Sequence, residues 1–465
     1  MLESLEPKEV FRYFEEICAI PHGSGDLAKI GDYCEAFAKA HNLWCMRDGF
    51  GNVIIKKDGD ERAPVILQGH LDMVCVKTPD CTHDFKNDPL PIRTDGETIY
   101  TNGTTLGADD GIAVAMILAI LADDTLKTPP IEAVLTADEE VGMSGAMGLD
   151  ASVLRGRRML NLDTETEGSF CVSCAGGERV RITRDVQTEP CNAPCYKAAL
   201  SGLQGGHSGT EIDKGHLNAI RCMVHLLIAV ADVRLVSLTG GKVDNAIPSA
   251  CTAVFSGNAQ ALRNIFETLR PHWSKAEPDI TLTVEETEPA EICLDRASTD
   301  AALAVISQFP DGVDEMSEEV PGMVQTSLNT GRCTVDADGV RMVISTRSNA
   351  DEDRKDLVRG LVKRCEKHSA DAETSGGYPA WQYRKDSPLR EAAARVFEKQ
   401  YGHAPKIEGI HAGLECGIFS SKLEDFDCIS IGPDIYDIHT PSERMPVRSV
   451  ARTYALVREI LQTLK

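Results

Sequence analysis

The residues best suited to chemistry are acids and histidines that follow apolar stretches of the chain. His70 and Asp72 come late in the segment 65–74, whose apolar and β-prone residues predict a buried strand. Residues two apart on an extended chain point to the same face. Either both groups face one cleft, or Asp72 folds back and holds the ring, which makes the other ring nitrogen a better metal ligand. The alternative interpretation is a structural histidine at a strand end.

Further acids follow the next apolar stretches in the same way. The set comprises Asp109 and Asp110, Glu139 and Glu140, and Asp163. Asp110 is well placed to cap the apolar helix that follows it, which leaves Asp109 free to face a cleft. Carboxylates gathered at one end of a sheet, without basic residues among them, repel one another unless cations are bound there. The pattern therefore predicts a metal site.

A second imidazole comes from near the C-terminus. His439 follows the short apolar strand CISIG in a loop, where an ordinary turn histidine is the alternative. Two histidines with several carboxylates form a borderline-soft ligand set, which suits zinc and also cobalt or manganese. Glu139 and Glu140 alternate in direction on an extended segment, so one can bind a metal ion while the other hydrogen-bonds a water molecule.

Alternating strands and helices are expected to position these groups. Helices are predicted over residues 7–20, over a segment ending near Ala40 with Ser24 or Asp26 as its cap, and over the apolar run 112–121. Strands are predicted over 52–56 and 63–68. This order predicts an α/β fold with a mixed or parallel sheet, in which ligands bind beyond the carboxyl ends of the strands.

The middle of the chain has a different pattern, because short strands alternate there with polar loops. We expect an inserted domain over residues 177–379, between catalytic-domain parts at 1–176 and 380–465. His207 lies between glycine pairs, which let the backbone turn and leave the ring exposed for a functional role. Asn245 and Arg347 lie at or near strands, and each alone is more typical of a surface residue. An arginine there can also bind a carboxylate with two hydrogen bonds.

Composition limits the partners. The chain has 465 residues, enough for two or three domains, and a formal net charge of −24. This charge argues against nucleic acid and anionic membranes, since both require basic patches. The N-terminus is acidic where a signal peptide is basic, and no apolar run approaches the length of a membrane span. A cytoplasmic protein is therefore expected, with its 16 cysteines mostly reduced.

One set of cysteines has a spacing close to that of a structural zinc ribbon. Its members are Cys171, Cys174, Cys191 and Cys195. The residues between the two pairs, GGERVRITRDVQ, are typical of a regular strand and not of the tight turns of a ribbon. Small buried residues are therefore the favoured interpretation.

The ordered motifs HLDMV, LGADDG, ADEEVG, NLD and IHTPSE resemble those of the co-catalytic zinc peptidases, the family that includes aminoacylases, carboxypeptidase G-type enzymes and carnosinases. GGHSG and NAIP extend the match. CAGG, HAGLECG and SIGP are similar to motifs of bacterial dipeptidases of the aminoacyl-histidine type. The resemblance covers nearly the whole chain. It implies an α/β catalytic domain, whose mixed sheet is flanked by helices and carries a di-zinc site, with an inserted α+β lid and dimerisation domain.

The resemblance also implies roles for individual residues. Its first zinc ligands are His70, Asp109 and Asp163, and its second set is Asp109, Glu140 and His439, with Asp109 bridging. The resemblance also implies that Asp72 orients His70, that Glu139 is the general base and that His207 stabilises the oxyanion. It implies substrate contacts by Asn245, Arg347 and Gly413. In relatives of this kind the peptide bond between Asp109 and Asp110 is cis.

The function implied is hydrolysis of dipeptides, in particular Xaa-His dipeptides including carnosine-like substrates, by a homodimer. A metal-bridging hydroxide attacks, with Glu139 as general base. Alternatives on the same site are an N-acyl amino acid deacylase and a tripeptide aminopeptidase. A metal-binding protein without catalysis is disfavoured because Glu139, an acid that is not a ligand, accompanies the full ligand set. No G-x-S-x-G motif indicates a serine nucleophile.

Overall fold

The computed structural model describes residues 1–465 and divides them into two compact units. Unit 1 comprises residues 1–173, 383–409 and 414–465, and unit 2 comprises residues 174–382 and 410–413. The boundaries at 173/174 and 382/383 lie close to the expected ones at 176/177 and 379/380. The short return of residues 410–413 to unit 2 has no counterpart in the sequence analysis.

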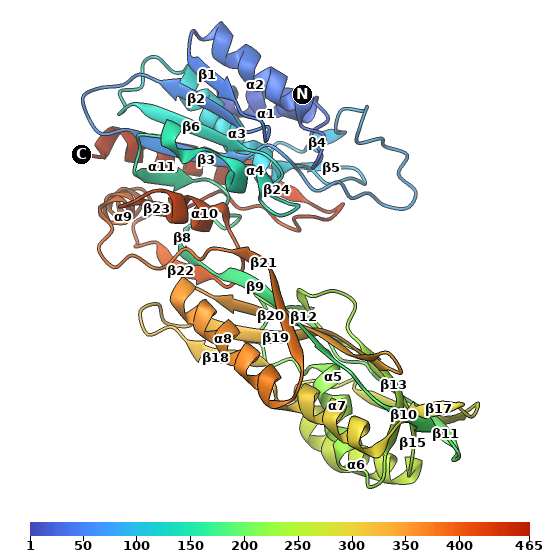
Figure 1. The fold of residues 1–465 in the computed structure, drawn as a ribbon. Coiled ribbons are helices and arrows are strands. Elements are labelled where there is room, and N and C mark those ends of the chain that lie inside the picture. Colours follow the sequence, from blue (N-terminus) through green and yellow to red (C-terminus); the bar gives the residue numbers. More distant parts are fainter. The chain divides into compact units, whose positions relative to one another are not determined.

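Unit 1 is built on an eight-stranded mixed sheet with the order β1-β2-β6-β3-β7-β23-β8-β22 (Figure 1). Its strands are β1 Trp44–Arg47, β2 Val53–Lys57, β3 Val65–His70, β6 Ile131–Thr136, β7 Arg158–Asn161, β8 Ser169–Cys174, β22 Lys406–Ile410 and β23 Asp427–Ser430. β3 is parallel to β6 and β7, and β7 is parallel to β23, whereas β1, β2 and β6 are antiparallel. The expected mixed α/β sheet is therefore confirmed.

Helices and a small second sheet complete unit 1. The helices are α1 Lys8–Cys18, α2 Ala28–Ala40, α3 Ala108–Ala122, α4 Ser144–Gly148, the 3-10 helix η1 Ala151–Val153, α9 Pro388–Tyr401, α10 Glu415–Lys422 and α11 Val447–Thr463. The small sheet has the order β24-β5-β4, with β4 Ile92–Thr94, β5 Thr98–Thr101 and β24 Arg444–Pro446. α3 is buried along almost its whole length and packs on α1 and β3, which explains its apolar sequence.

The start of α2 differs from the prediction. Its N-cap residue is Leu27, and no side chain caps it. The hydroxyl of Ser24 instead donates to Asp72 Oδ2 at 2.8 Å. The predicted capping role of Ser24 or Asp26 is therefore wrong, because the helix begins after Leu27 and has no side-chain cap.

Unit 2 is built on a nine-stranded antiparallel sheet with the order β16-β11-β15-β13-β19-β20-β9-β21, and β18 pairs with β19. Its strands are β9 Gly176–Arg184, β11 Cys195–Ser201, β13 Arg234–Gly240, β15 Cys251–Ser256, β16 Thr281–Thr287, β18 Gly312–Met316, β19 Val324–Asp336, β20 Gly339–Ser348 and β21 Asp371–Tyr378. Two short ribbons pair β10 Thr188–Pro190 with β17 Ile292–Leu294, and β12 Gly206–His207 with β14 Ala246–Ile247.

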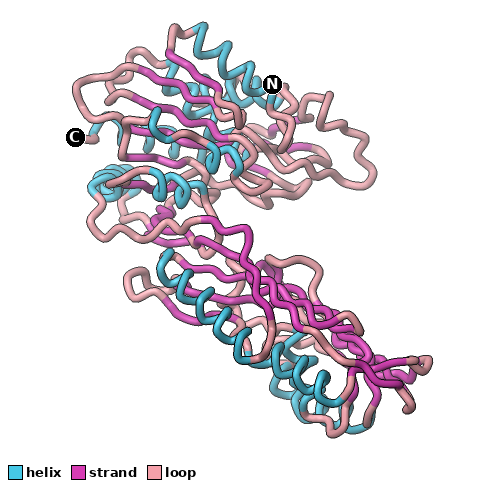
Figure 2. Tube along the Cα trace, viewed as in Figure 1, coloured by secondary structure: helices cyan, strands magenta, loops and turns pink.

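The helices of unit 2 cover one face of this sheet. They are α5 Ala219–Ile228, α6 Ala259–Trp273, α7 Arg296–Gln308 and α8 Asp351–Lys367 (Figure 2). Alternate residues of β9 and β20, such as Val180, Ile182 and Ile344, belong to the hydrophobic core shared with these helices. The residues between them, including Arg347, therefore occupy the opposite face of the sheet.

The four cysteines with ribbon-like spacing do not form a single cluster, although Cys191 Sγ and Cys195 Sγ lie 3.5 Å apart. Cys171 and Cys174 are buried in β8, Cys195 is buried at the start of β11, and Cys191 is partly exposed. No group of side chains suited to a metal ion includes any of them. The favoured interpretation as small buried residues is confirmed for three of the four. No helix of the chain is both long and apolar enough to cross a lipid bilayer.

Candidate functional site

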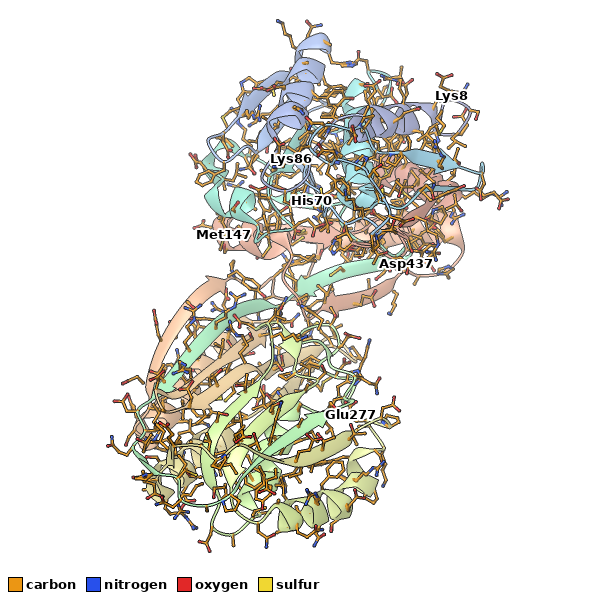
Figure 3. All side chains as sticks on the ribbon, turned by 90° about the vertical axis from the view of Figure 1, so that its right-hand side faces the viewer. Lys8, His70, Lys86, Met147, Glu277 and Asp437 are labelled. Carbon is orange, nitrogen blue, oxygen red and sulfur yellow. The ribbon has the colours of Figure 1, made fainter.

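The carboxyl ends of β3, β6 and β7 bring the predicted strand-end residues to one edge of the sheet. The parallel register aligns His70 with Thr136 and Gln68 with Asn161. The acids that follow these strands in sequence therefore emerge at the same edge of the sheet. His70, labelled in Figure 3, is 1% exposed inside unit 1.

Asp109 lies between the two predicted imidazoles. Its Oδ1 is 3.1 Å from His70 Nε2, and its Oδ2 is 3.0 Å from His439 Nε2. The two oxygens of one carboxylate thus face different histidines, which is the arrangement expected of a bridging ligand. The Asp109–Asp110 peptide bond is cis, as the resemblance implies.

Two further acids flank this central group. Asp163 Oδ1 lies 3.5 Å from His70 Nε2, and Glu140 Oε1 lies 2.9 Å from His439 Nε2. All five predicted metal ligands therefore converge on Asp109. Glu165, which the sequence analysis missed, offers a carboxylate oxygen within 4.8 Å of Asp109 and Asp163.

Burial and the repulsion between neighbouring carboxylates shift the pKa values of the acids in this cluster. Burial, with Asp109 and Glu140 nearby, raises the pKa of Asp163 to about 6, and burial with Asp109 and Asp163 nearby raises that of Glu165 to about 8. Hydrogen bonds that His439 donates to the carboxylates of Asp109 and Glu140 raise the pKa of His439 to about 10. No lysine or arginine forms an ion pair with any of these acids.

This donor set fits divalent metal ions. Two imidazole nitrogens and several buried carboxylate oxygens lie close together, and no lysine or arginine pairs with these acids to offset their negative charge. Divalent cations held by nitrogen and oxygen ligands remove the same repulsion. The residues present therefore fit the group that the sequence predicts.

Asp72 holds the backbone beside Glu139 as well as approaching His70. The closer partner of His70 Nδ1 is the backbone oxygen of Asp72 at 2.9 Å, whereas its carboxylate oxygen lies 3.5 Å away. The Asp72 carboxylate accepts the backbone N–H groups of Glu139 and Glu140 at 2.9 and 3.3 Å. The ring is thus oriented chiefly by a backbone carbonyl, and the side chain fixes the segment that carries the two glutamates.

Asp110 does not cap the helix after it. Its Oδ2 accepts the backbone N–H of His70 at 3.1 Å. The N–H groups at the start of α3 are bound instead by Glu443, whose Oε1 accepts from Ala108 and Asp109 at 2.8 and 3.3 Å. Glu443 Oε2 accepts from Leu106 at 2.7 Å. The buried Glu443 therefore fixes the backbone that presents Asp109, a role that the sequence analysis missed.

A second acid that the sequence analysis missed, Glu415, contacts side chains of β3 and β6 near the carboxyl ends of these strands. Its Oε2 accepts from Gln68 Nε2 and Thr136 Oγ1, both at 2.6 Å. Gln68 in turn accepts from Asn161 Nδ2 at 2.5 Å, so one chain of hydrogen bonds joins β7, β3 and β6. Burial raises the pKa of Glu415 to about 8. This ladder fixes the spacing of the strands that carry the metal-binding groups.

Glu139 stands apart from the imidazoles. Neither histidine forms an ion pair with it. Burial, with Asp163, Glu415 and Glu140 nearby, raises the pKa of Glu139 well above its usual range. A carboxyl with a high proton affinity and no metal-ligand partner suits proton transfer.

His207 lies in unit 2 with its tautomer set by the backbone. Its Nδ1 accepts the N–H groups of Gly209 and Thr210 at 3.3 and 3.2 Å, so Nε2 carries the proton of the neutral ring. Burial and the nearby Arg347 lower the pKa of His207. The ring is therefore a neutral donor through Nε2.

The loop of Asn245 is held beside His207. The backbone oxygen of Asn245 accepts the N–H of Ser208 at 2.9 Å. Ser345 Oγ donates to the backbone oxygen of Asp244 at 2.9 Å, and Asn329 Nδ2 donates to that of Ala246 at 2.9 Å. Asn245 and Arg347 line one small cavity of unit 2.

The segment containing Gly413 is anchored in unit 2 through His411. His411 Nδ1 pairs with Asn349 Oδ1 at 2.9 Å, and its Nε2 pairs with Ser327 Oγ at 2.8 Å. A Cβ on Gly209 would lie 2.3 Å from the backbone oxygen of His411, so only glycine fits there. The four predicted unit 2 residues are thus linked: His207 and Asn245 through the backbone, Arg347 through the shared cavity, and Gly413 through this anchor.

The model of peptidase family M20/M25/M40 matches residues 66–463. The chain belongs to this family. Among relatives, cytosol non-specific dipeptidase from Escherichia coli (strain K12) is 35% identical, over 100% of this chain and 99% of the relative. Among solved structures, aminoacylhistidine dipeptidase from Vibrio alginolyticus is 36% identical with a TM-score of 0.93, covering 100% of this chain and 98% of that one. Aminopeptidase PepT from Bacillus cereus, 16% identical with a TM-score of 0.63 over 98% of each chain, shares the fold.

Membership of the M20/M25/M40 family confirms the resemblance drawn from the motifs. Together with the cluster of metal-binding side chains, it identifies the chain as a metal-dependent enzyme that hydrolyses peptide bonds. The motif IHTPSE contains both His439 and the missed Glu443. Its final glutamate was therefore a signal available in the sequence.

Proposed function

We propose that this enzyme is a cytoplasmic dipeptidase that acts on Xaa-His dipeptides, including carnosine-like ones, with two zinc ions per chain. Cobalt or manganese would suit the same ligands. The observation that carries the proposal is Asp109, whose two oxygens face His70 and His439 within about 3 Å. The Escherichia coli and Vibrio alginolyticus relatives, a non-specific dipeptidase and an aminoacylhistidine dipeptidase, support a dipeptide substrate.

The proposed metal ligands fall into two sets that share Asp109. One set is His70, Asp109 and Asp163, and the other is Asp109, Glu140 and His439. When bound, two such ions acidify a water molecule and polarise the scissile carbonyl. Asp72 and Glu443 hold the backbone that presents these ligands.

Glu139 is the proposed general base. Its backbone is fixed by Asp72, and its carboxyl makes no ion pair with the imidazoles. It takes a proton from the attacking water and passes it to the nitrogen of the leaving amine. Each turnover thus returns the carboxylate to its starting state.

Residues of unit 2 are proposed to bind the substrate. His207 donates from Nε2 to the oxyanion of the tetrahedral intermediate, because its Nδ1 is occupied as an acceptor. Asn245, Arg347 and the loop of Gly413 contact the C-terminal side of the substrate. These roles need only donors, which matches the neutral imidazole and the guanidinium found there.

A substrate panel with metal analysis tests the proposal. Purified enzyme is assayed on Ala-His, carnosine, other dipeptides, tripeptides and N-acetyl amino acids, before and after chelation. We expect dipeptide cleavage that chelation abolishes and that zinc restores. Faster cleavage of N-acetyl amino acids or of tripeptides would assign the site to a deacylase or a tripeptide aminopeptidase instead.

We further propose a homodimer, joined through unit 2, in which His207 serves the partner's metal site. Glu139→Ala and His207→Ala are each expected to be nearly inactive. Refolding the two variants together regains activity if His207 is shared, since one site of a mixed dimer is then complete. A mixture that exchanges subunits yet stays inactive would assign His207 to its own chain.

A further inference from the structure

Two thiols of the set with ribbon-like spacing lie side by side in unit 2. Cys191 directly follows β10 and Cys195 begins β11, at the end of unit 2 where β10, β11 and β17 lie together (Figure 1). The two Sγ atoms are 3.5 Å apart. Both also approach the backbone oxygen of Ala193, at 3.9 and 3.8 Å. The turn CNAPC therefore holds its two thiols on one side of Ala193.

The two ends of this turn are fixed, but its middle is not part of a sheet. The N–H of Cys191 donates to the backbone oxygen of Glu291 at 3.0 Å, and Cys195 pairs with strands on both sides of it. Residues 192–194 belong to no helix or strand. Because the S–S bond of a disulfide is about 2.05 Å long, the two sulfurs need to approach by only about 1.5 Å. Rotation of the side chains and adjustment of residues 192–194 can provide that movement.

Exposure distinguishes the two thiols. Cys195 is fully buried, and burial with Cys191 nearby raises the pKa of the Cys195 thiol. Cys191 is partly exposed. An oxidant in solution reaches an exposed thiol first, and a neighbouring thiol then resolves the product as a disulfide. Cys191 is therefore placed to react with the oxidant, and Cys195 to form the disulfide.

A third thiol, Cys293 of β17, lies within hydrogen-bonding reach of Cys191. Burial and the neighbouring Cys191 thiol raise the pKa of Cys293 to about 12. The register of β10 with β17 pairs Cys293 with Glu189, so Cys191 is its diagonal neighbour. Diagonal positions of antiparallel strands are about 7–8 Å apart, whereas the Cβ atoms of a disulfide are about 3.5–4.5 Å apart. The geometry therefore favours Cys195 over Cys293 as the disulfide partner.

We infer that Cys191 and Cys195 form a redox-sensitive dithiol, in which hydrogen peroxide oxidises Cys191 and the product is trapped as a disulfide with Cys195. The Cys191 sulfur attacks one peroxide oxygen, the O–O bond breaks, and one water molecule leaves a sulfenic acid behind. The Cys195 sulfur then attacks the Cys191 sulfur, the S–O bond breaks, and a second water molecule leaves with the thiol proton. Two thiols thus lose two electrons, and one peroxide becomes two water molecules. A dithiol reductant reverses the modification.

Unit 1 provides an internal control for this inference. The Sγ atoms of Cys416 in α10 and Cys428 in β23 are 3.7 Å apart, nearly as close as those of the turn. Both of these cysteines are buried. If proximity alone decided oxidation, the two pairs would react together. If an exposed thiol is also required, the pair in the turn reacts first.

Peroxide titration with peptide mapping tests the inference on the intact protein. After oxidation the remaining thiols are alkylated in denaturant, and the protein is digested with trypsin. Cys191 and Cys195 share the tryptic peptide 185–197, whereas Cys293 lies in the peptide 276–296. We expect the peptide 185–197 to lose two hydrogens and both alkyl labels at about tenfold less peroxide than modifies the buried pair of unit 1. Dithiothreitol should restore both labels.

The same map contains the results that would overturn the inference. One is equal sensitivity of the two thiol pairs to peroxide. The other is a cross-link between the peptides 185–197 and 276–296 in place of the disulfide within the turn. The readout is independent of peptidase activity, so it does not depend on the proposed function.

Three single variants test the order of the two steps. Cys195→Ser should leave Cys191 as a sulfenic acid that dimedone labels, because the resolving thiol is gone. Cys191→Ser should leave Cys195 reduced at the peroxide concentration that oxidises the unchanged protein. Cys293→Ser is the matched control and should still form the disulfide. Dimedone labelling of Cys195 in Cys191→Ser at that concentration would contradict the assigned order.

Discussion

Both units contain buried charges that lack a partner of opposite charge, and the sign of the unpaired charge differs between them. Around Asp109 in unit 1, buried carboxylates gather with no lysine or arginine paired to them. Around Arg347 in unit 2, a buried guanidinium has no carboxylate paired to it. The imbalance of buried charge therefore has opposite sign in the two units, negative around Asp109 and positive around Arg347. Because folded proteins normally pair their buried charges, an unpaired set is informative about ligands.

Removing the central acid should disturb unit 1 most. Asp109→Ala deletes one oxygen facing each imidazole, so we expect loss of metal at both positions and no detectable hydrolysis. Asp163→Ala removes a group that approaches the imidazole of His70 but not that of His439, and should retain more metal. Metal analysis of dialysed proteins compares the two, and equal loss would count against a bridging Asp109.

Replacing the proposed general base should leave the metal-binding side chains unchanged but greatly reduce the rate of hydrolysis. Glu139→Gln is nearly isosteric but cannot take a proton, and this step typically contributes about 10²–10⁴-fold to the rate. We expect that loss in kcat with unchanged metal content. A near-normal kcat would remove Glu139 from the role of base.

Glu443 tests whether the supporting backbone matters to the cluster. Glu443→Gln keeps the size of the side chain but weakens its bonds to the N–H groups of residues 106–109. Groups that hold a metal ligand in place typically contribute about 10–100-fold to metal affinity or activity. We expect a loss in this range, measured by competition with a chelator. Glu424→Gln, at an exposed acid near the end of α10, is the matched control and should bind metal normally.

His411 predicts a smaller, pH-dependent effect confined to unit 2. Its folded pKa of about 3 lies below the ordinary value of 6.5, so between these values the unfolded chain binds the extra proton. Stability should therefore fall as pH drops below about 6.5, by up to about 1.4 kcal/mol per pH unit. His411→Asn should be less stable near neutrality but show a shallower slope. Urea unfolding at pH 6.5 and 5 compares them, and parallel slopes would contradict the prediction.

The convergence of acids and histidines in unit 1 could be predicted from sequence, because most of them follow an apolar strand whose carboxyl end must lie at one edge of the sheet. Local pattern was enough to place His70, Asp109 and Asp163. It was not enough for Glu443, whose partners lie more than 300 residues earlier in the chain. Asp110 was misassigned for a similar reason, because its carboxylate accepts the backbone N–H of His70, which lies 40 residues earlier in the chain.

The contact in which the Tyr378 hydroxyl accepts a hydrogen bond from Arg347 Nη1 at 2.8 Å was not predicted, because of the geometry of the strand that carries Tyr378. The pairing of β21 with β9 shifts between Ser375 and Tyr378, so counting alternate residues along β21 does not give the face of the tyrosine. Its partner Arg347 appeared only as a lone arginine near a strand. The glycine that lets the two side chains meet, Gly177, carries no chemistry of its own and becomes meaningful only through the register.

The return of residues 410–413 to unit 2 affects how the chain can be divided into fragments. A fragment ending at residue 382 would omit His411, and with it the ring that contacts Ser327 and Asn349. It would also omit the backbone oxygens of Ile410 and Ala412, which accept the N–H of Ala175 at 3.1 and 3.0 Å. Unit 2 is therefore formed by two separate segments of the chain. A fragment designed to fold as unit 2 alone needs residues 410–413 joined to residues 174–382.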